Sequence, residues 1–146
     1  GSKSTKEFIV IGGVTNAFAN KMKDKFAGKS IRFMGGIYNQ EDLTVIRNSS
    51  SLYFHGHTVG GTNPSLLEAM GSGSMVLAHE NPFNASVLGG LGALWKDEEV
   101  LTRLLTQRPS MEIRSEQARL SRERIKTHFN WEDVAKNYLK SFASLK

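Results

Sequence analysis

HGHTVGGTNPSLLEAM, residues 55–70, is the stretch that decides the fold class. An apolar segment ends at His55, a glycine-rich turn follows, and Asn63 and Pro64 then open a segment with helical spacing. Asparagine is a favourable N-cap, and proline suits the next position because the first helical N–H groups need no partner. The stretch therefore predicts a strand, a turn and a helix over residues 64–70, followed by a second apolar strand at 75–78.

The same alternation extends in both directions along the chain. Strands that alternate with helices through short links form a parallel sheet covered by helices. The predicted fold class is thus α/β, with a Rossmann-like parallel sheet and helices on both faces. The predicted strands are residues 7–11, 30–34, 52–55, 75–78 and 92–94. The predicted helical segments are residues 17–27, 40–48, 64–70, 84–88 and 111–129. Two further helices are predicted to begin after the caps Asp97 and Asn130.

Length and composition predict a single soluble domain over residues 3–146. Hydrophobic residues make up 39% of the 146 residues and charged residues 23%, which is ordinary for a soluble protein. We interpret Gly1-Ser2 as a remnant of cloning. The chain has no cysteine, which excludes a disulfide scaffold and thiolate metal sites. The absence of cysteine also suits the cytoplasm, where we expect the protein to be located. No apolar run approaches the roughly 20 residues that span a bilayer.

Basic residues cluster near both ends of the chain. The net charge is +5, from 19 basic and 14 acidic residues, and the clusters lie within residues 3–29 and 114–126. A solvated surface is the favoured interpretation, and the alternative is peripheral association with the inner face of an anionic membrane. No nucleic-acid partner is expected, because the basic segment at 114–126 lacks interleaved aromatic residues.

The carboxyl ends of the predicted strands carry glycines and polar residues. Ligands of parallel α/β sheets bind beyond these ends, and glycine lets a ligand approach the backbone closely. The pattern indicates a ligand site there, although glycines also simply end strands. The ends are Gly12-Gly13, Gly35-Gly36-Ile37, His55-Gly56-His57 and His79-Glu80-Asn81.

The turn before residue 64 has the layout of an anion site. The amides of Gly61, Thr62, Asn63 and Ser65 are expected to point toward one anion, such as a diphosphate, with help from the helix dipole. Neither the G-x-x-x-x-G-K-[ST] motif nor G-x-G-x-x-G occurs here, which argues against an ATPase and a dinucleotide enzyme.

Glu68 lies among apolar neighbours in the same predicted helix. A buried carboxylate needs a partner, and two vicinal ribose hydroxyls would suit its two oxygens. The alternative is an exposed helical glutamate.

His55 and His57 are two residues apart, on one side of a strand end. Their favoured role is to bind a diphosphate or sugar hydroxyls, and the alternative is a zinc site completed by His79 and Glu80. The chain has no D-x-D motif. We therefore expect no metal and no other cofactor, with the helix dipole and side chains stabilising the anion instead.

Residues 67–78, LEAMGSGSMVLA, resemble the hallmark of the retaining glycosyltransferase family four, which has the GT-B fold. Residues 31–37 and 129–132 resemble two further family segments, so the resemblance covers roughly residues 7–142. Residues 55–70 and the Asn81-Pro82-Phe83-Asn84 segment are similar to a bacterial rhamnosyltransferase-like subgroup.

The resemblance implies that the chain is the donor-binding, C-terminal half of a GT-B enzyme, truncated at its start. Glu68 would bind the donor ribose, Ile37 would lie against the base, and Gly60, Gly61, Thr62 and Asn63 would line the diphosphate and sugar. Gly60 occupies the position of the family's first glutamate, so His57, Thr62 or Asn63 would replace that contact. The predicted site also includes His55, Gly12 and Gly13.

By the same resemblance, the parent enzyme would transfer a sugar from a nucleotide-diphosphate sugar, and dTDP-rhamnose is one candidate donor. The acceptor would be a glycan or a lipid-linked molecule. The reaction would belong to the synthesis of capsule or another cell-surface polysaccharide. This piece is expected to bind donor and to be inactive alone. The alternative is a non-catalytic module that binds a nucleotide or glycan. Helices 111–146 are expected to dock on this domain or on the acceptor-binding N-terminal domain, through an apolar face that includes Trp131, Tyr138 and Phe142.

Overall fold

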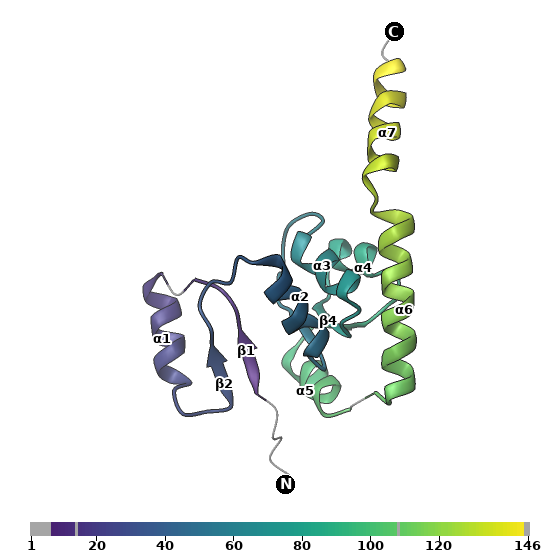
Figure 1. Ribbon diagram of the computed structural model, residues 1–146. Helices are drawn as coiled ribbons and strands as arrows, with labels where there is room; N and C mark the ends of the chain where they lie inside the picture. The colour runs from purple at the N-terminus through teal and green to yellow at the C-terminus, as the bar shows by residue number, and fades with distance from the viewer. Residues whose placement is uncertain (1–6, 14, 108, 145–146) are drawn as a thin grey trace. The chain divides into compact units, whose positions relative to one another are not determined.

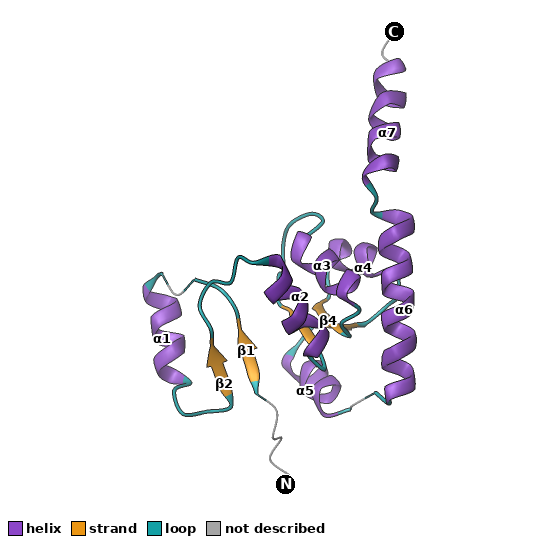
Figure 2. Ribbon diagram, viewed as in Figure 1, coloured by secondary structure: helices purple, strands orange, loops and turns teal. Residues whose placement is uncertain are grey.

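The computed structural model describes residues 7–13, 15–107 and 109–144. The predicted α/β class is confirmed: parallel strands lie in two sheets with helices around them, consistent with a Rossmann-like fold (Figures 1 and 2). Contacts divide the chain into two compact units, residues 1–43 and 44–146. The prediction of a single domain stays a prediction.

The first unit contains a two-stranded sheet and one helix. Strands β1 (Phe8–Val10) and β2 (Ile31–Phe33) pair in parallel, with Ile9 opposite Arg32. Helix α1 (Ala17–Lys25) connects them, and the predicted cap Asn16 is confirmed because its side chain accepts a hydrogen bond from the Ala19 amide at 2.8 Å. Helix α2 (Gln40–Ser49) follows and runs across the boundary between the units.

The second unit is built on a three-stranded parallel sheet. Its strands are β3 (Tyr53–His55), β4 (Val76–His79) and β5 (Ala93–Trp95), hydrogen-bonded in the order β3-β4-β5. The sequence predicted one sheet, and the described strands instead form two separate sheets. All but one of the strands are three residues long, so each carries only a few ladder hydrogen bonds.

Helices α3 (Pro64–Ser72) and α4 (Pro82–Leu88) follow β3 and β4. The predicted Asn63 cap and Pro64 at the first helical turn are confirmed. The helical turn predicted at residues 84–88 begins earlier, because Asn81 caps α4 by accepting a hydrogen bond from the Asn84 amide at 2.8 Å. Asp97 caps α5 (Glu98–Thr106) as predicted.

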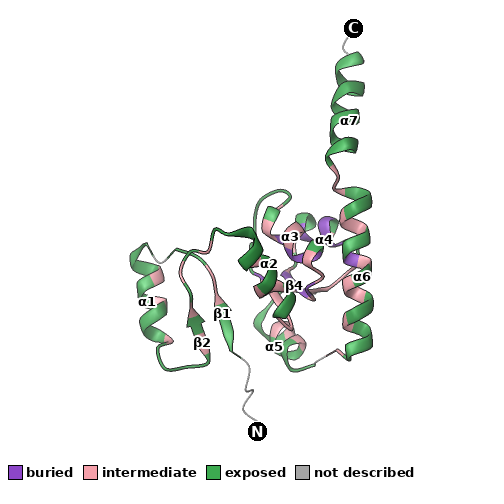
Figure 3. Ribbon diagram, in the orientation of Figure 1, coloured by how far each residue is buried: buried purple, intermediate pink, exposed green. Residues whose placement is uncertain are grey.

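The hydrophobic core lies between the sheet of the second unit and helices α3 and α4. Every buried residue in the described ranges belongs to this unit, and Figure 3 shows them gathered around α3, α4 and β4. The apolar side chains that are fully or almost fully buried are Leu66, Ala69, Met70, Val76, Leu77, Ala78, Val87 and Leu88. This core fixes the position of α3, and with it the turn that precedes the helix.

Two helices close the chain. Helix α6 (Met111–His128) packs against α3, while every described residue of α7 (Trp131–Ala143) is exposed. Trp131 and Phe142 expose 85% and 62% of their surface, so the apolar face of α7 has no partner in the described residues. No helix in the described ranges combines the length and apolarity that a membrane crossing requires.

Candidate functional site

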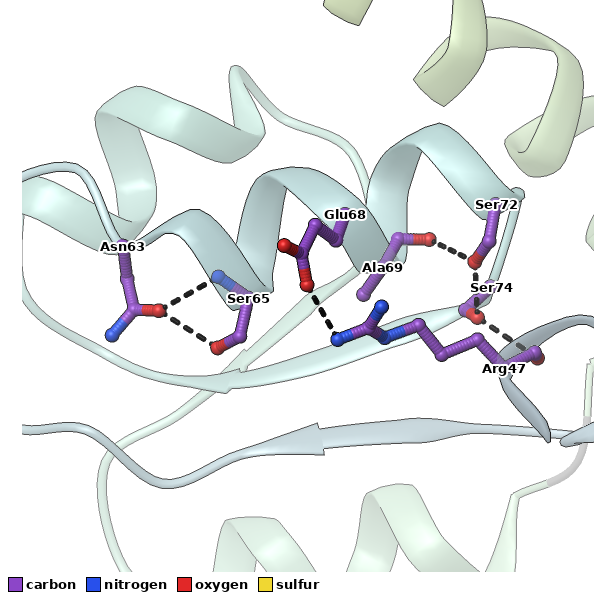
Figure 4. Close-up of polar contacts among 7 residues, drawn as sticks. All are labelled: Arg47, Asn63, Ser65, Glu68, Ala69, Ser72 and Ser74. Atoms are coloured by element: carbon purple, nitrogen blue, oxygen red, sulfur yellow. Dashed lines mark hydrogen bonds and ion pairs between the residues drawn. The ribbon is translucent and has the colours of Figure 1, made fainter. Parts of the chain in front are cut away.

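The turn that enters α3 presents amides without a protein partner. Asn63 Oδ1 accepts hydrogen bonds from the Ser65 amide at 3.0 Å and from Ser65 Oγ at 2.7 Å (Figure 4). The expectation that the Ser65 amide is free is therefore wrong, because the N-cap uses it. Within the described ranges, the backbone amides of Gly61, Thr62 and Asn63 donate to no protein group. Three of the four predicted donors remain available to an anion.

Gly60 has a backbone conformation that a glutamate would rarely adopt. Its backbone φ is +117°, a value that residues other than glycine rarely adopt. A glutamate here would strain the turn even though the space around the ideal Cβ is open. The turn therefore depends on backbone amides, and any side-chain contact with a ligand has to come from its neighbours.

Two asparagines of the Asn81-Pro82-Phe83-Asn84 segment hold the start of the turn. The side-chain amides of Asn81 and Asn84 both donate to the His57 carbonyl, each at 3.1 Å, and Asn84 also donates to the His79 carbonyl at 2.9 Å. Asn84 is only 4% exposed. It thus connects the carboxyl ends of β3 and β4 from within the core. The sequence analysis did not predict this role. The pattern that could have indicated it is a pair of asparagines three residues apart, directly after a buried strand.

His55 and His57 do lie together, as the spacing predicts. Their rings stack with centroids 4.7 Å apart, but only His57 is exposed, and His55 is 1% exposed. Burial, with a smaller contribution from the charge of His57, lowers the pKa of His55 to about 4. His55 is therefore neutral at physiological pH and lies within the core, whereas His57 lies on the surface.

Glu68 has a protein partner that sequence reasoning did not identify. Arg47 Nη2, from α2, donates to Glu68 Oε2 at 2.6 Å (Figure 4). The glutamate side chain is 39% exposed and that of Arg47 only 11%. Glu68 is therefore less buried than expected, because its side chain is only half-buried. Arg47 supplies a hydrogen bond to one of the two carboxylate oxygens. The other oxygen is free of any described protein partner.

The other predicted residues follow the strands of the first unit. Gly12 and Gly13 follow β1 and are exposed, and the Gly12 amide donates to the Gly35 carbonyl at 2.9 Å. Ile37 is half-buried after β2. These three residues belong to the first unit, so the site described here, in the second unit, contains the His57–Asn63 turn and Glu68.

The alternative of a zinc site has no geometric basis in the described residues. No three His, Asp or Glu side chains there lie close enough to hold a metal ion. His79 instead meets the Trp95 ring edge-on at 4.8 Å. The sequence spacing of His55, His57, His79 and Glu80 alone does not bring their ligand atoms together.

The basic helix α6 uses its arginines within the protein. Arg122 donates to the Ser72 carbonyl at 2.7 Å, and Arg124 donates to the Val87 and Ser86 carbonyls at 2.8 and 2.7 Å. These carbonyls end α3 and α4, where cations are favourable. Arg119 pairs with Glu116 and Glu123. Much of the basic charge of α6 therefore binds the helix to the core or is paired with acidic residues of the same helix.

Comparison with known proteins gives one distant similarity that bears on the site. The chain is 27% identical over 144 residues to an uncharacterized glycosyltransferase of Methanocaldococcus jannaschii. The match covers 94% of this chain and 36% of the relative, so the chain spans about a third of the relative's length. No protein-family model matches. This distant similarity suggests a glycosyltransferase.

Proposed function

We propose that this chain is the donor-binding part of a glycosyltransferase and that it binds a nucleoside diphosphate at the turn before α3. The observation that carries the proposal is the combination of three unpaired amides in the turn, at Gly61, Thr62 and Asn63, with the half-buried carboxylate of Glu68 in the helix that follows. The distant similarity to a glycosyltransferase supports the class of reaction.

The chemistry of the turn suits a departing diphosphate. Unpaired amides at a helix N-terminus bind anions, and the helix dipole adds a partial positive charge. During sugar transfer, negative charge grows on the diphosphate as the glycosidic bond breaks, so fixed donors there lower the barrier. In this proposal His57, which is exposed beside the turn, donates to a phosphate or to a sugar hydroxyl. No metal is needed for this stabilisation.

The finer assignment rests on the sequence resemblance. We propose a retaining enzyme of family four with a GT-B fold, in its rhamnosyltransferase-like subgroup. The donor would be a nucleotide-diphosphate sugar such as dTDP-rhamnose, and the acceptor a glycan or lipid-linked sugar for cell-surface polysaccharide, used on the cytoplasmic side of the membrane. The acceptor would bind an N-terminal domain outside this chain.

Binding of donor can be measured directly. Isothermal titration of the chain with UDP-, GDP- and dTDP-sugars should show binding to one class of nucleotide, and Glu68→Ala should weaken that binding by about tenfold or more. Glu99→Ala, which removes an exposed carboxylate from the first turn of α5, is the matched control and should leave affinity unchanged. Equal, weak responses to all nucleotides, or none, would overturn the proposal.

A non-catalytic binding module is the rival function. The two are separated by assaying the full parent protein for sugar transfer to acceptor. Tight donor binding without any transfer or donor hydrolysis would favour the rival.

A further inference from the structure

Three side chains at the carboxyl ends of the second unit's strands hold buried ring nitrogens without a hydrogen-bond partner. Within the described ranges, both ring nitrogens of His55 lack a partner, while His79 and Trp95 each lack one at a single buried nitrogen. His55 is also the most buried of the three, at 1% exposed. Buried polar atoms in native proteins nearly always have a partner, so an imidazole with two orphaned nitrogens is a candidate ligand-binding group.

His79 and Trp95 lie on the opposite face of the sheet from His55. Phe54 pairs in register with Leu77, which lies two residues before His79, so these three side chains share one face. His55 follows Phe54 directly and therefore lies on the other face. On their own face the rings of His79 and Trp95 meet edge-on, with centroids 4.8 Å apart, a geometry that suits an N–H directed at an aromatic ring. His55 has no such neighbour for its nitrogens.

The exposed ring of His57 covers one side of the His55 ring. The two rings stack with centroids 4.7 Å apart and planes 26° apart. The backbone of His57 is fixed, because the side-chain amides of Asn81 and Asn84 donate to its carbonyl. Its ring, in contrast, makes no hydrogen bond within the described ranges. The ring can therefore turn about its side-chain torsions while the backbone of the turn stays in place, and this rotation opens a path from the surface to His55.

A neutral histidine is suited to bind an oxygen. Burial lowers the pKa of His55 to about 4, so the ring is neutral at physiological pH. A neutral imidazole carries one N–H donor and one acceptor nitrogen. Oxygens of a phosphate or of a hydroxyl both accept a hydrogen bond from such an N–H, so the two are one chemistry for this group.

We infer that His55 is a ligand-binding residue: when the His57 ring turns away, a ring N–H of His55 donates to an oxygen of the diphosphate or of the sugar attached to it. This inference deepens the proposed function and rests on it, because it takes the nucleotide to bind at the turn that begins with His57. The stacked pair then has two members with different tasks, a fixed buried donor and a movable exposed ring.

His55→Phe tests the inference, because it keeps an aromatic ring in the stack and removes both nitrogens. Parent and variant are titrated calorimetrically at pH 7.5 with UDP, GDP and dTDP, and with UDP-glucose, GDP-mannose and dTDP-rhamnose. In the series that binds, the variant should lose about three- to tenfold in affinity, the worth of one hydrogen bond. An equal loss for nucleotide and nucleotide sugar assigns a phosphate oxygen, and a loss confined to the nucleotide sugar assigns a sugar oxygen.

The stability of the same variant separates a binding role from a structural one. The urea midpoint of His55→Phe at pH 7.5 should be no lower than that of the parent, because no buried nitrogen is left without a partner. A lower midpoint with unchanged affinity would mean that His55 serves the fold alone and would overturn the inference.

His79→Phe is the matched control, because it removes a histidine with a buried unpartnered nitrogen from the opposite face. It should leave all affinities unchanged. An equal loss of affinity in both variants would overturn the inference, while the binding of nucleotide by the parent would still support the proposed function. No binding of any of these nucleotides by the parent would overturn the proposed function, and this inference with it.

NMR of the histidine rings tests the inference without a substitution. The ring nitrogens of His55 in the 15N-labelled chain should shift on saturation with the nucleotide that binds, because an N–H begins to donate to an oxygen. Ring signals of His55 that stay in place at saturation would overturn the inference, whether or not the phenylalanine variant folds.

Discussion

The two units share one sequence pattern and differ in what it builds. In each, a short strand runs through a turn into a helix and then into a parallel neighbour. Helix α3 carries Leu66, Ala69 and Met70, all 0% exposed, whereas none of the described residues of the first unit is buried. Helix α1 instead carries three lysines along its length. The alternation of strands and helices thus specifies topology, and the apolar content of the helix decides whether a core forms.

The largest expected effect contrasts the two helices directly. Leu66→Ala leaves a cavity under α3 and should lower the free energy of unfolding by about 2–5 kcal/mol. Phe18→Ala, at a 69% exposed position of α1, should change it by less than about 0.5 kcal/mol. Urea unfolding followed by circular dichroism measures both. Similar losses for the two variants would break the comparison, because they would place a core in the first unit as well.

The asparagine connection beside the turn should have the next largest effect. Asn84→Ala removes donors from the His57 and His79 carbonyls and should cost about 1–3 kcal/mol of stability, because buried acceptors lose their partners. Hydrogen exchange of the Leu66 and Leu67 amides, which donate to the Asn63 carbonyl at the end of the turn, should speed up in the same variant. Phe83→Ala, at a 51% exposed neighbour in α4, is the control. Unchanged exchange in Asn84→Ala would show that the turn is held by something else.

The pH dependence of stability sharpens the role of His55. Its pKa is about 4 in the folded chain, below the ordinary value of 6.5, because burial disfavours the charged ring. The unfolded chain therefore binds the proton more readily, and stability should fall as the pH is lowered from about 6.5 toward 4. At pH 5 the loss amounts to about 2 kcal/mol relative to pH 7.5. Urea unfolding of the parent and of His55→Phe at pH 5 and pH 7.5 measures this loss, which the variant should lack. The same difference in unfolding free energy between the two pH values in both proteins would refute the role of His55.

Local sequence rules predicted the elements and the position of the turn well, and the partners of its side chains poorly. The caps Asn16, Asn63 and Asp97 are confirmed because capping depends on residues within one helical turn. The pairing of Arg47 with Glu68 joins residues 21 positions apart, and the hydrogen bond of Asn84 to the His57 carbonyl joins residues 27 apart. Such contacts depend on how helices pack, which spacing alone does not encode. Burial of His55 depends in the same way on the helices over its strand.

The central claim is that the unpaired amides before α3 receive a diphosphate. The most direct test is a titration of the 15N-labelled chain with UDP, GDP and dTDP, observed by amide NMR. The amides of Gly61, Thr62 and Asn63 should shift most and downfield, as expected when an N–H begins to donate to an anion, and Glu68→Ala should reduce the affinity without moving the response elsewhere. Saturable binding that leaves these three amides unshifted and perturbs another part of the chain would contradict the account.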